Sequence, residues 1–523
     1  MKSCIKFLFI ITAMLVSASC QDYNQLVKNP NLPTKASPSL ILTGIINTMN
    51  NENAWNGIQG SMSAQQFWIS SYTYYGTNNY DQSPFQNINF NYYSTLENVQ
   101  RMEIEAKNSG AGDVNPYSAL GKFFRAFYFN LMSQKFGDIP MSQALQGSAT
   151  TAPVYDTQKS IYVQVLKWLD NSNADFNTLI ASNDQTLSGS IFLGNDLKAW
   201  QKVVNTFTLR VLIGLSKKSG DADLNVKQAF ANILNNPAKY PILTGNADNL
   251  QYVYNAQFNN YPKNPGNRGF TSGREVVSAT YLNLTTSLND PRTFIVATPA
   301  PALLATYPYT DFRAYVGGSP GTDMSTLGTD SQAGKYSWVN ALRYYSTYDG
   351  SKAEPTIIIG YPELCFNVAE GINLGWVSGS SSTWYTNGIK ASMSFLGITE
   401  GGTITVGDNV LKVYGTVPTF ISTYLAQPSV QYQGDNANGL NQILTQKYIA
   451  FWQNSNWEAF FNQRRTGVPT FLTGPGTGNN GKVPVRWIYP IAEQSANASN
   501  YHAAVQSQYG GTDDLNGQMW ILQ

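Results

Sequence analysis

Carboxylates are the first side chains of this 523-residue chain to test for chemistry, because a pair of acids can hydrolyse a glycosidic bond. Glu363 and Glu370 form the best pair, since their spacing places both on one face of a predicted helix. Seven residues separate them by about 10.5 Å along the helix axis, which exceeds the window that glycoside hydrolases use. We therefore expect structural roles for both glutamates, with a glycoside hydrolase kept only as a minor alternative.

Other catalytic and metal-binding arrangements find little support in the sequence. His502 is the only histidine, so no triad with a histidine base and no histidine metal cluster can form. Arg464 and Arg465 could bind an anion, but charge compensation at a helix C-terminus explains them equally well. Four aspartates could supply oxygen ligands to calcium, but their spacing matches no calcium loop: Asp311, Asp323, Asp330 and Asp349. We predict no metal, no cofactor and no enzymatic activity.

Aromatic side chains are the unusual feature of the composition. They make up 13% of the residues, against 12% charged residues, and many lie in stretches rich in Asn, Gly and Ser. An aromatic face beside amides suits a sugar, whose C–H face stacks while its hydroxyls form hydrogen bonds. For any one aromatic residue, burial in the core is the alternative. The predicted ligand contacts are Trp55, Trp68, Tyr74, Tyr75, Tyr80, Tyr307, Tyr309, Trp338, Arg343 and Tyr345.

The N-terminal segment has the pattern of a secretory signal. Lys2 and Lys6 precede the apolar run Phe7–Val16, and small residues then lead to Cys20. The run has about 10 residues, whereas a membrane-spanning helix needs roughly 20. Small residues before a cysteine resemble a bacterial lipobox, so we expect residues 1–19 to be removed and Cys20 to carry the lipid anchor. An ordinary signal peptide, with Cys20 left as a spare thiol, is the alternative.

The composition of the rest of the chain predicts one large soluble domain attached to that lipid anchor. Its 33 basic and 32 acidic residues give a net charge of +1, and nothing indicates the basic face that nucleic acid requires. After removal of the signal and acylation of Cys20, Cys365 is the only remaining thiol, which excludes a disulfide framework. No linker separates two cores, so we predict a single domain over residues 21–523.

Apolar periodicity predicts helices that follow one another in antiparallel pairs. One covers 117–136 and ends at Gly137, and two more start with Asp156 and Asp196 as N-caps. A later helix begins at Pro362 and runs to Gly375. Two more helices cover about 383–396 and 440–454. Between about 220 and 355 the periodicity fades. Long irregular stretches of this kind are often ligand-binding or lid elements, and a surface elaboration without a role is the alternative.

Short motifs along the whole chain, taken together and in order, resemble the SusD/RagB-like family of nutrient-binding outer-membrane lipoproteins. They are NPNLPT at 29–34, RAFY at 125–128, FGDIP at 136–140, PVYDTQ at 153–158, NDPR at 289–292, YPE at 361–363, AEG at 369–371, QKYIA at 446–450, RRTG at 464–467 and YP at 489–490.

The resemblance implies a mainly α fold, with tetratricopeptide-like paired helices forming a right-handed superhelical scaffold and a loop-rich region over one face. It also implies a SusC-like TonB-dependent outer-membrane transporter as partner, on which the helical side docks while the loops hold the nutrient. The protein would then be lipid-anchored in the outer membrane and face the cell exterior. The aromatic and amide content favours an oligosaccharide as nutrient. A peptide is the main alternative, and a purely structural surface protein is a third.

Overall fold

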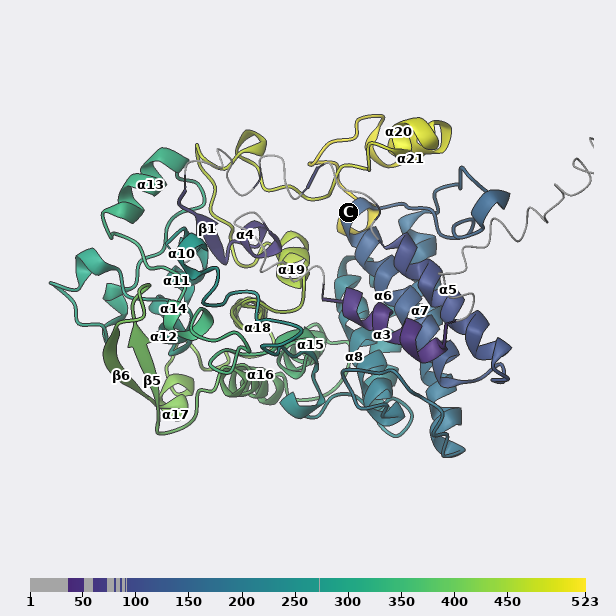
Figure 1. Ribbon diagram of the computed structural model, residues 1–523, viewed down its shortest axis with the longest axis horizontal. Helices are drawn as coiled ribbons and strands as arrows, with labels where there is room; N and C mark the ends of the chain where they lie inside the picture. The colour runs from purple at the N-terminus through teal and green to yellow at the C-terminus, as the bar shows by residue number, and fades with distance from the viewer. Residues whose placement is uncertain are drawn as a thin grey trace, which may run out of the picture.

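The computed structural model describes residues 36–50, 60–72, 80, 85–86, 90, 92–271 and 273–523. The fold is mainly α-helical, as predicted, and its helices pack in pairs (Figure 1). The predicted signal peptide, Cys20 and the 29–34 motif lie outside the described residues. None of the described helices is long and apolar enough to cross a membrane.

The first half of the chain forms the helical part, on the right of Figure 1. Helix α6 (Pro116–Phe136) buries aromatic rings: those of Phe123 and Phe127 lie 5.7 and 5.4 Å from the ring of Phe207 in α8 (Leu197–Gly214). Helices that follow one another in the chain pack against one another. The helices are α3 (Pro38–Thr48), α5 (Tyr93–Asn108), α6 (Pro116–Phe136), α7 (Gln158–Ala181), α8 (Leu197–Gly214) and α9 (Val226–Asn235).

Helix ends in this part follow local capping chemistry. The Asn115 side chain caps α6 by accepting from the backbone N–H of Tyr117 and Ser118, and Gly137 ends the helix with a φ of 88°. Asp196 caps α8 as predicted. The prediction for α7 was wrong by one residue, because Thr157 is the N-cap. Asp156 instead accepts two backbone N–H groups, from Met141 and Ser142, at 2.8 Å.

The second half of the chain contains a further helix pair, α15 (Tyr361–Asn373) and α16 (Ser381–Phe395), on which α18 (Ala437–Ala450) packs. Pro362 occupies the first turn of α15, as the sequence predicts. The chain also forms shorter helices outside these two groups. They are α4 (Ser61–Ala64), α17 (Ile421–Leu425), α19 (Glu458–Thr466), α20 (Glu493–Ala496) and α21 (Ala498–Tyr509), of which α20 and α21 lie together at the top of Figure 1.

The segment 220–355 holds α9 and then short elements joined by long connections. These are β2 (Leu250–Tyr252), α10 (Arg268–Thr271), β3 (Glu275–Val277), α11 (Ala279–Ser287), α12 (Arg292–Val296), α13 (Met324–Gln332) and α14 (Ala341–Tyr344). Three antiparallel strand pairs occur among the described residues: β1 (Trp68–Ser70) with β3, β2 with β4 (Thr356–Ile359), and β5 (Gly402–Gly407) with β6 (Val413–Thr419). The β5–β6 hairpin lies on the left of Figure 1, far from α5 to α7.

Candidate functional site

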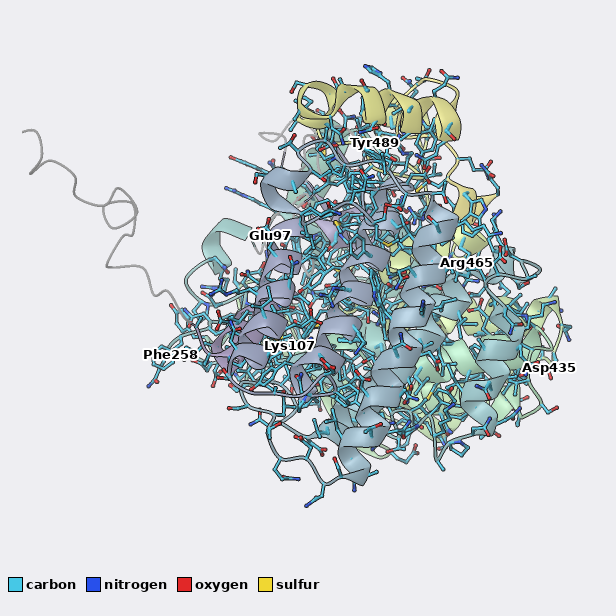
Figure 2. All side chains as sticks on the ribbon, turned by 90° about the vertical axis from the view of Figure 1, so that its right-hand side faces the viewer. Glu97, Lys107, Phe258, Asp435, Arg465 and Tyr489 are labelled. Atoms are coloured by element: carbon cyan, nitrogen blue, oxygen red, sulfur yellow. The ribbon has the colours of Figure 1, made fainter. Side chains whose placement is uncertain are left out.

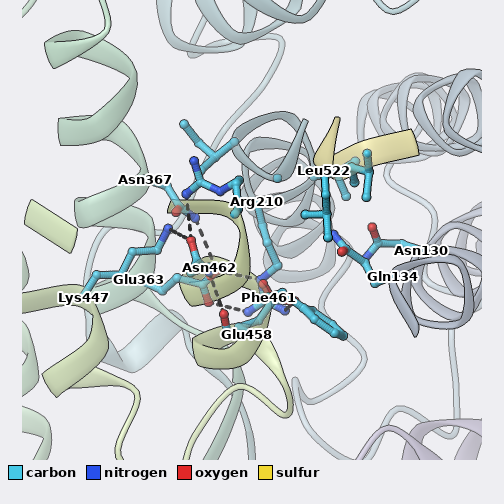
Figure 3. Close-up of a pocket in the computed structure, with 15 residues that line it drawn as sticks. Asn130, Gln134, Arg210, Glu363, Asn367, Lys447, Glu458, Phe461, Asn462 and Leu522 are labelled. Carbon is cyan, nitrogen blue, oxygen red and sulfur yellow. Dashed lines mark hydrogen bonds and ion pairs between the residues drawn. The ribbon is translucent and has the colours of Figure 1, made fainter. Parts of the chain in front are cut away.

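Glu363, the first member of the carboxylate pair, is held in a buried ion pair. Its side chain is 5% exposed and accepts from Nε of Arg210 at 2.7 Å. The carboxylate of Glu458 lies 4.0 Å from the same arginine. Figure 3 shows these groups around a cavity of about 20 Å³ between α8, α15 and α19. A space of that size holds about one water molecule, so the cluster joins helices and offers no room for a sugar.

Glu370, the second member of the pair, is also held in buried ion pairs. It accepts from Nη1 of Arg465 at 2.6 Å and lies 3.4 Å from Nζ of Lys447. Burial raises the pKa of Glu370, but the two cations outweigh it and leave the pKa below its ordinary value. Arg464 donates to the backbone oxygens of Gln134 and Val485. These side chains therefore have structural roles, as the sequence analysis expects.

The four aspartates considered for calcium also have other partners. Asp311 pairs with Arg313, and Asp330 pairs with Lys335 at 2.7 Å. Asp323 caps α13, and Asp349 accepts from the backbone N–H of Ser351. Within the described ranges, no three His, Cys, Asp or Glu side chains gather in a group that could hold a metal ion.

Three of the predicted ligand contacts lie buried in the core. Trp68 is fully buried in β1, with its ring 5.9 Å from that of Trp452. Tyr80 is buried and donates to the backbone oxygen of Ala64 at 3.1 Å. Tyr345 is buried and donates to Glu275 at 2.7 Å. Their packing and hydrogen bonds give these side chains a structural role in the described part of the chain.

Trp55, Tyr74 and Tyr75 lie outside the described residues. Trp338 is half-buried against Leu327, and its indole N–H donates to Ser331 Oγ at 3.2 Å. The prediction for these residues stays untested.

Arg343, Tyr307 and Tyr309 fall on the loop-rich side of the molecule. Arg343 lines a cleft of about 530 Å³ between α14, the end of α16 and the β5–β6 hairpin. This volume lies within the range of small-ligand sites. We call it the hairpin cleft, and its lining is Ile295, Asn340, Leu342, Arg343, Ser351, Lys352, Ala353, Phe395, Leu396, Gly397, Thr403, Ile404, Thr405 and Val413.

The guanidinium of Arg343 is fixed in place before any ligand arrives. Its Nε donates to Glu354 at 2.9 Å and its Nη2 donates to the backbone oxygen of Leu396 at 3.0 Å. Burial lowers the pKa of Arg343, but the charge of Glu354 outweighs this and raises the pKa further above its ordinary value. The side chain remains 18% exposed. The cleft therefore presents a permanent, preorganised hydrogen-bond donor.

Two aromatic rings stack at the β5–β6 hairpin, outside the lining of the cleft. The ring of Tyr309 stacks on that of Tyr414, with centroids 6.2 Å apart and planes inclined by 18°. Tyr414 directly follows Val413, which lines the cleft. Tyr307 lies under the guanidinium of Arg313, 4.5 Å from its ring centroid. Both members of the Tyr309–Tyr414 pair are half-buried, so parts of their surfaces stay open to solvent.

The hairpin is the part of this site that sequence reasoning missed. Ile404 and Val406 alternate with Thr403 and Thr405, so the apolar side chains are buried while the threonines face solvent. Asp408 caps the turn by accepting from the backbone N–H of Val410 and Lys412. That alternation, followed by Gly407-Asp408-Asn409, was the available signal for a hairpin.

The chain is similar to proteins of one known family. Residues 30–490 match a family model of SusD-like proteins described as "Starch-binding associating with outer membrane". No curated protein matches the chain.

Several solved structures resemble the whole fold. A SusD homolog from Bacteroides fragilis is 30% identical, with a TM-score of 0.79, and the match covers 93% of this chain and 100% of that one. A candidate outer-membrane nutrient-binding protein from Bacteroides vulgatus is 29% identical, with a TM-score of 0.76 and the same coverage. A chitin-binding SusD homolog from Flavobacterium johnsoniae is 19% identical, with a TM-score of 0.67, over 92% of this chain and 98% of that one. That last similarity concerns the fold alone.

Proposed function

The chain belongs to the SusD-like family of outer-membrane nutrient-binding proteins, and on that premise we propose that its nutrient is an oligosaccharide held at the hairpin cleft. Members of this family bind their ligands without catalysing a reaction, which agrees with the structural roles of Glu363 and Glu370. The observation that carries the proposal is the 530 Å³ cleft, which presents the fixed guanidinium of Arg343 and the exposed threonines Thr403 and Thr405.

The groups around the cleft match the two kinds of surface that a sugar presents. Its C–H face stacks on the exposed part of an aromatic ring, here Tyr309 or Tyr414. Its hydroxyls accept from the fixed guanidinium of Arg343 and exchange hydrogen bonds with the hydroxyls of Thr403 and Thr405. These groups are arranged by the scaffold in advance, so binding costs little ordering of the site.

Delivery is the second part of the proposal. Cys20 would carry the lipid that holds the protein on the outer membrane, facing the cell exterior. A SusC-like TonB-dependent transporter would receive the nutrient, with the helical part against the transporter and the loop-rich part, including 220–355, over its entrance. Membership of the family supports this arrangement.

A peptide is the second candidate ligand, and one observation favours it. The β5–β6 sheet has two strands, and Thr403, Ile404 and Thr405 of β5 line the cleft. The edge of β5 away from β6 has no strand partner among the described residues. An extended peptide could add to such an edge through its backbone.

The test is calorimetry on residues 21–523 with two panels, neutral oligosaccharides and peptides of matched length. Saturable binding to one class of oligosaccharide, with no heat from the peptides, supports the proposal. Binding to peptides alone would contradict the oligosaccharide as ligand, while the proposed delivery of a nutrient to the transporter would stand. A protein that binds neither panel would contradict the proposed ligand class.

A further inference from the structure

A second surface of the molecule has a composition unlike the rest. Three segments meet around α3: residues 36–50, 185–195 and 249–262. None of them contains Asp, Glu, Lys, Arg or His. In a protein of 12% charged residues, three adjoining segments without one charge form a surface that water solvates less strongly. We call this surface the charge-free face.

Side-chain contacts hold the three segments together. Thr43 of α3 donates to the backbone oxygen of Gly189 at 2.9 Å. Tyr252 donates to Asn47 of α3 at 3.1 Å, and its ring lies 5.3 Å from that of Phe192. The face is therefore one continuous surface and not three separate loops.

Large apolar side chains project from this face. Phe258 is 89% exposed, at the tip of a loop closed by the bridge between Asn255 and Asn259. Figure 2 shows it at the periphery of the molecule. Leu40 and Val253 are 70% and 61% exposed, and Ile191 is also exposed. Exposed apolar side chains gathered on one surface mark an interaction site.

We infer that the charge-free face rests on the lipid bilayer and inserts Phe258 and its apolar neighbours into it. This inference rests on the proposed anchor at Cys20. Fifteen residues lie between Cys20 and Ala36, so Ala36, just before α3, lies within about 55 Å of the anchor at full extension. The tether keeps this face, more than any later element, near the bilayer.

The chemistry of the face suits lipid. Protruding aromatic and aliphatic side chains surrounded by amides and hydroxyls resemble residues that sit at a membrane interface, about 5–10 Å into the headgroup region. Because the face has no basic residues, the contact does not depend on anionic lipid.

The experiment uses the acylated protein and places one reactive thiol on the face. Cys365 is fully buried and Cys20 is acylated, so Phe258→Cys can be labelled selectively with an environment-sensitive fluorophore. The labelled protein is bound to phosphatidylcholine vesicles that contain a lipid-borne quencher. Phe420→Cys is the matched control, because Phe420 is also exposed but follows the β5–β6 hairpin on the other side of the molecule.

The lipid-borne quencher is expected to quench the label at 258 and leave the label at 420 unchanged. Addition of phosphatidylglycerol should not alter the result. A label at 258 that stays in water on anchored protein overturns the inference, as does protection of that label only when the transporter is added. Failure of the anchor is distinguishable, since the protein would then lack an acyl chain by mass and would not float with the vesicles.

Discussion

Tyr309 and Tyr414 stack on each other across 105 positions of sequence, with ring centroids 6.2 Å apart. The contact joins the loop-rich segment 220–355 to a hairpin that begins well after it. The same two parts of the chain line the cleft, through Arg343 on one side and Thr403 and Thr405 on the other. The proposed ligand site therefore depends on a long-range contact and not on either segment alone.

Removal of the Tyr309 ring should lower the affinity for the ligand more than it lowers the stability of the fold. We expect Tyr309→Ala to lower oligosaccharide affinity about tenfold, or ~1.4 kcal/mol, because the sugar loses its stacking surface. Calorimetry measures the affinity, and a thermal melt shows that the fold persists. Phe258→Ala is the control, since it removes an equally large ring from the charge-free face. Equal losses in both variants would place the ligand elsewhere.

Arg343 and Glu354 should behave as a coupled pair in unfolding. Arg343→Met leaves a carboxylate that is 1% exposed without its cation, at a cost of about 3–5 kcal/mol. The double variant with Glu354→Gln should lose less than the sum of the two single changes. Urea unfolding of the four proteins gives the coupling. Strict additivity would show that the guanidinium is not fixed by Glu354.

The buried tryptophan Trp68 should matter for stability alone. Trp68→Ala removes a fully buried indole packed on Trp452, and we expect a loss of about 3–5 kcal/mol in the free energy of unfolding. Ligand affinity, measured well below the unfolding temperature, should stay at the wild-type value. If the Trp68→Ala protein were stable but bound the oligosaccharide more weakly, Trp68 would belong to the binding site.

The stability of the protein should fall as the pH rises from about 4.5 toward 7, because of Glu458. Burial raises the pKa of this carboxyl to about 7 against the opposing charge of Arg210. The folded protein then binds a proton that the unfolded chain has already released between about pH 4.5 and 7, so the free energy of unfolding decreases across that window. Glu458→Gln should flatten this decrease in urea titrations. An unchanged slope would mean that Glu458 is ionised in the folded state throughout.

The anchor can be tested at a single residue. Cys20→Ser should abolish acylation and release the protein from outer-membrane preparations, because a serine hydroxyl does not take the thioether-linked lipid that would anchor the protein. Mass spectrometry of the mature N-terminus and fractionation of the cells measure both effects. Membrane retention of the serine variant at wild-type levels would contradict the lipid anchor.

Helices were predictable from sequence, whereas the ligand-facing side chains were not. Gly137 and Asp196 act locally, through backbone conformation and capping, so their helix ends follow from neighbouring residues. The burial of Trp68 depends on pairing with Val277, more than 200 residues away. The sequence alone holds no local signal for such a contact. The hairpin, by contrast, had a local signal in the alternation that precedes Gly407-Asp408-Asn409, and only its packing against the segment 220–355 had none.

The most direct test of the oligosaccharide site is to obstruct the hairpin cleft. Thr405 lines the cleft and is exposed, and its cross-strand partner Thr416 is exposed but does not line it. Calorimetry with the best-binding oligosaccharide compares Thr405→Arg with Thr416→Arg, each checked by a thermal melt. We predict that the first variant loses binding while the second retains it. Full binding by a folded Thr405→Arg protein would contradict the site.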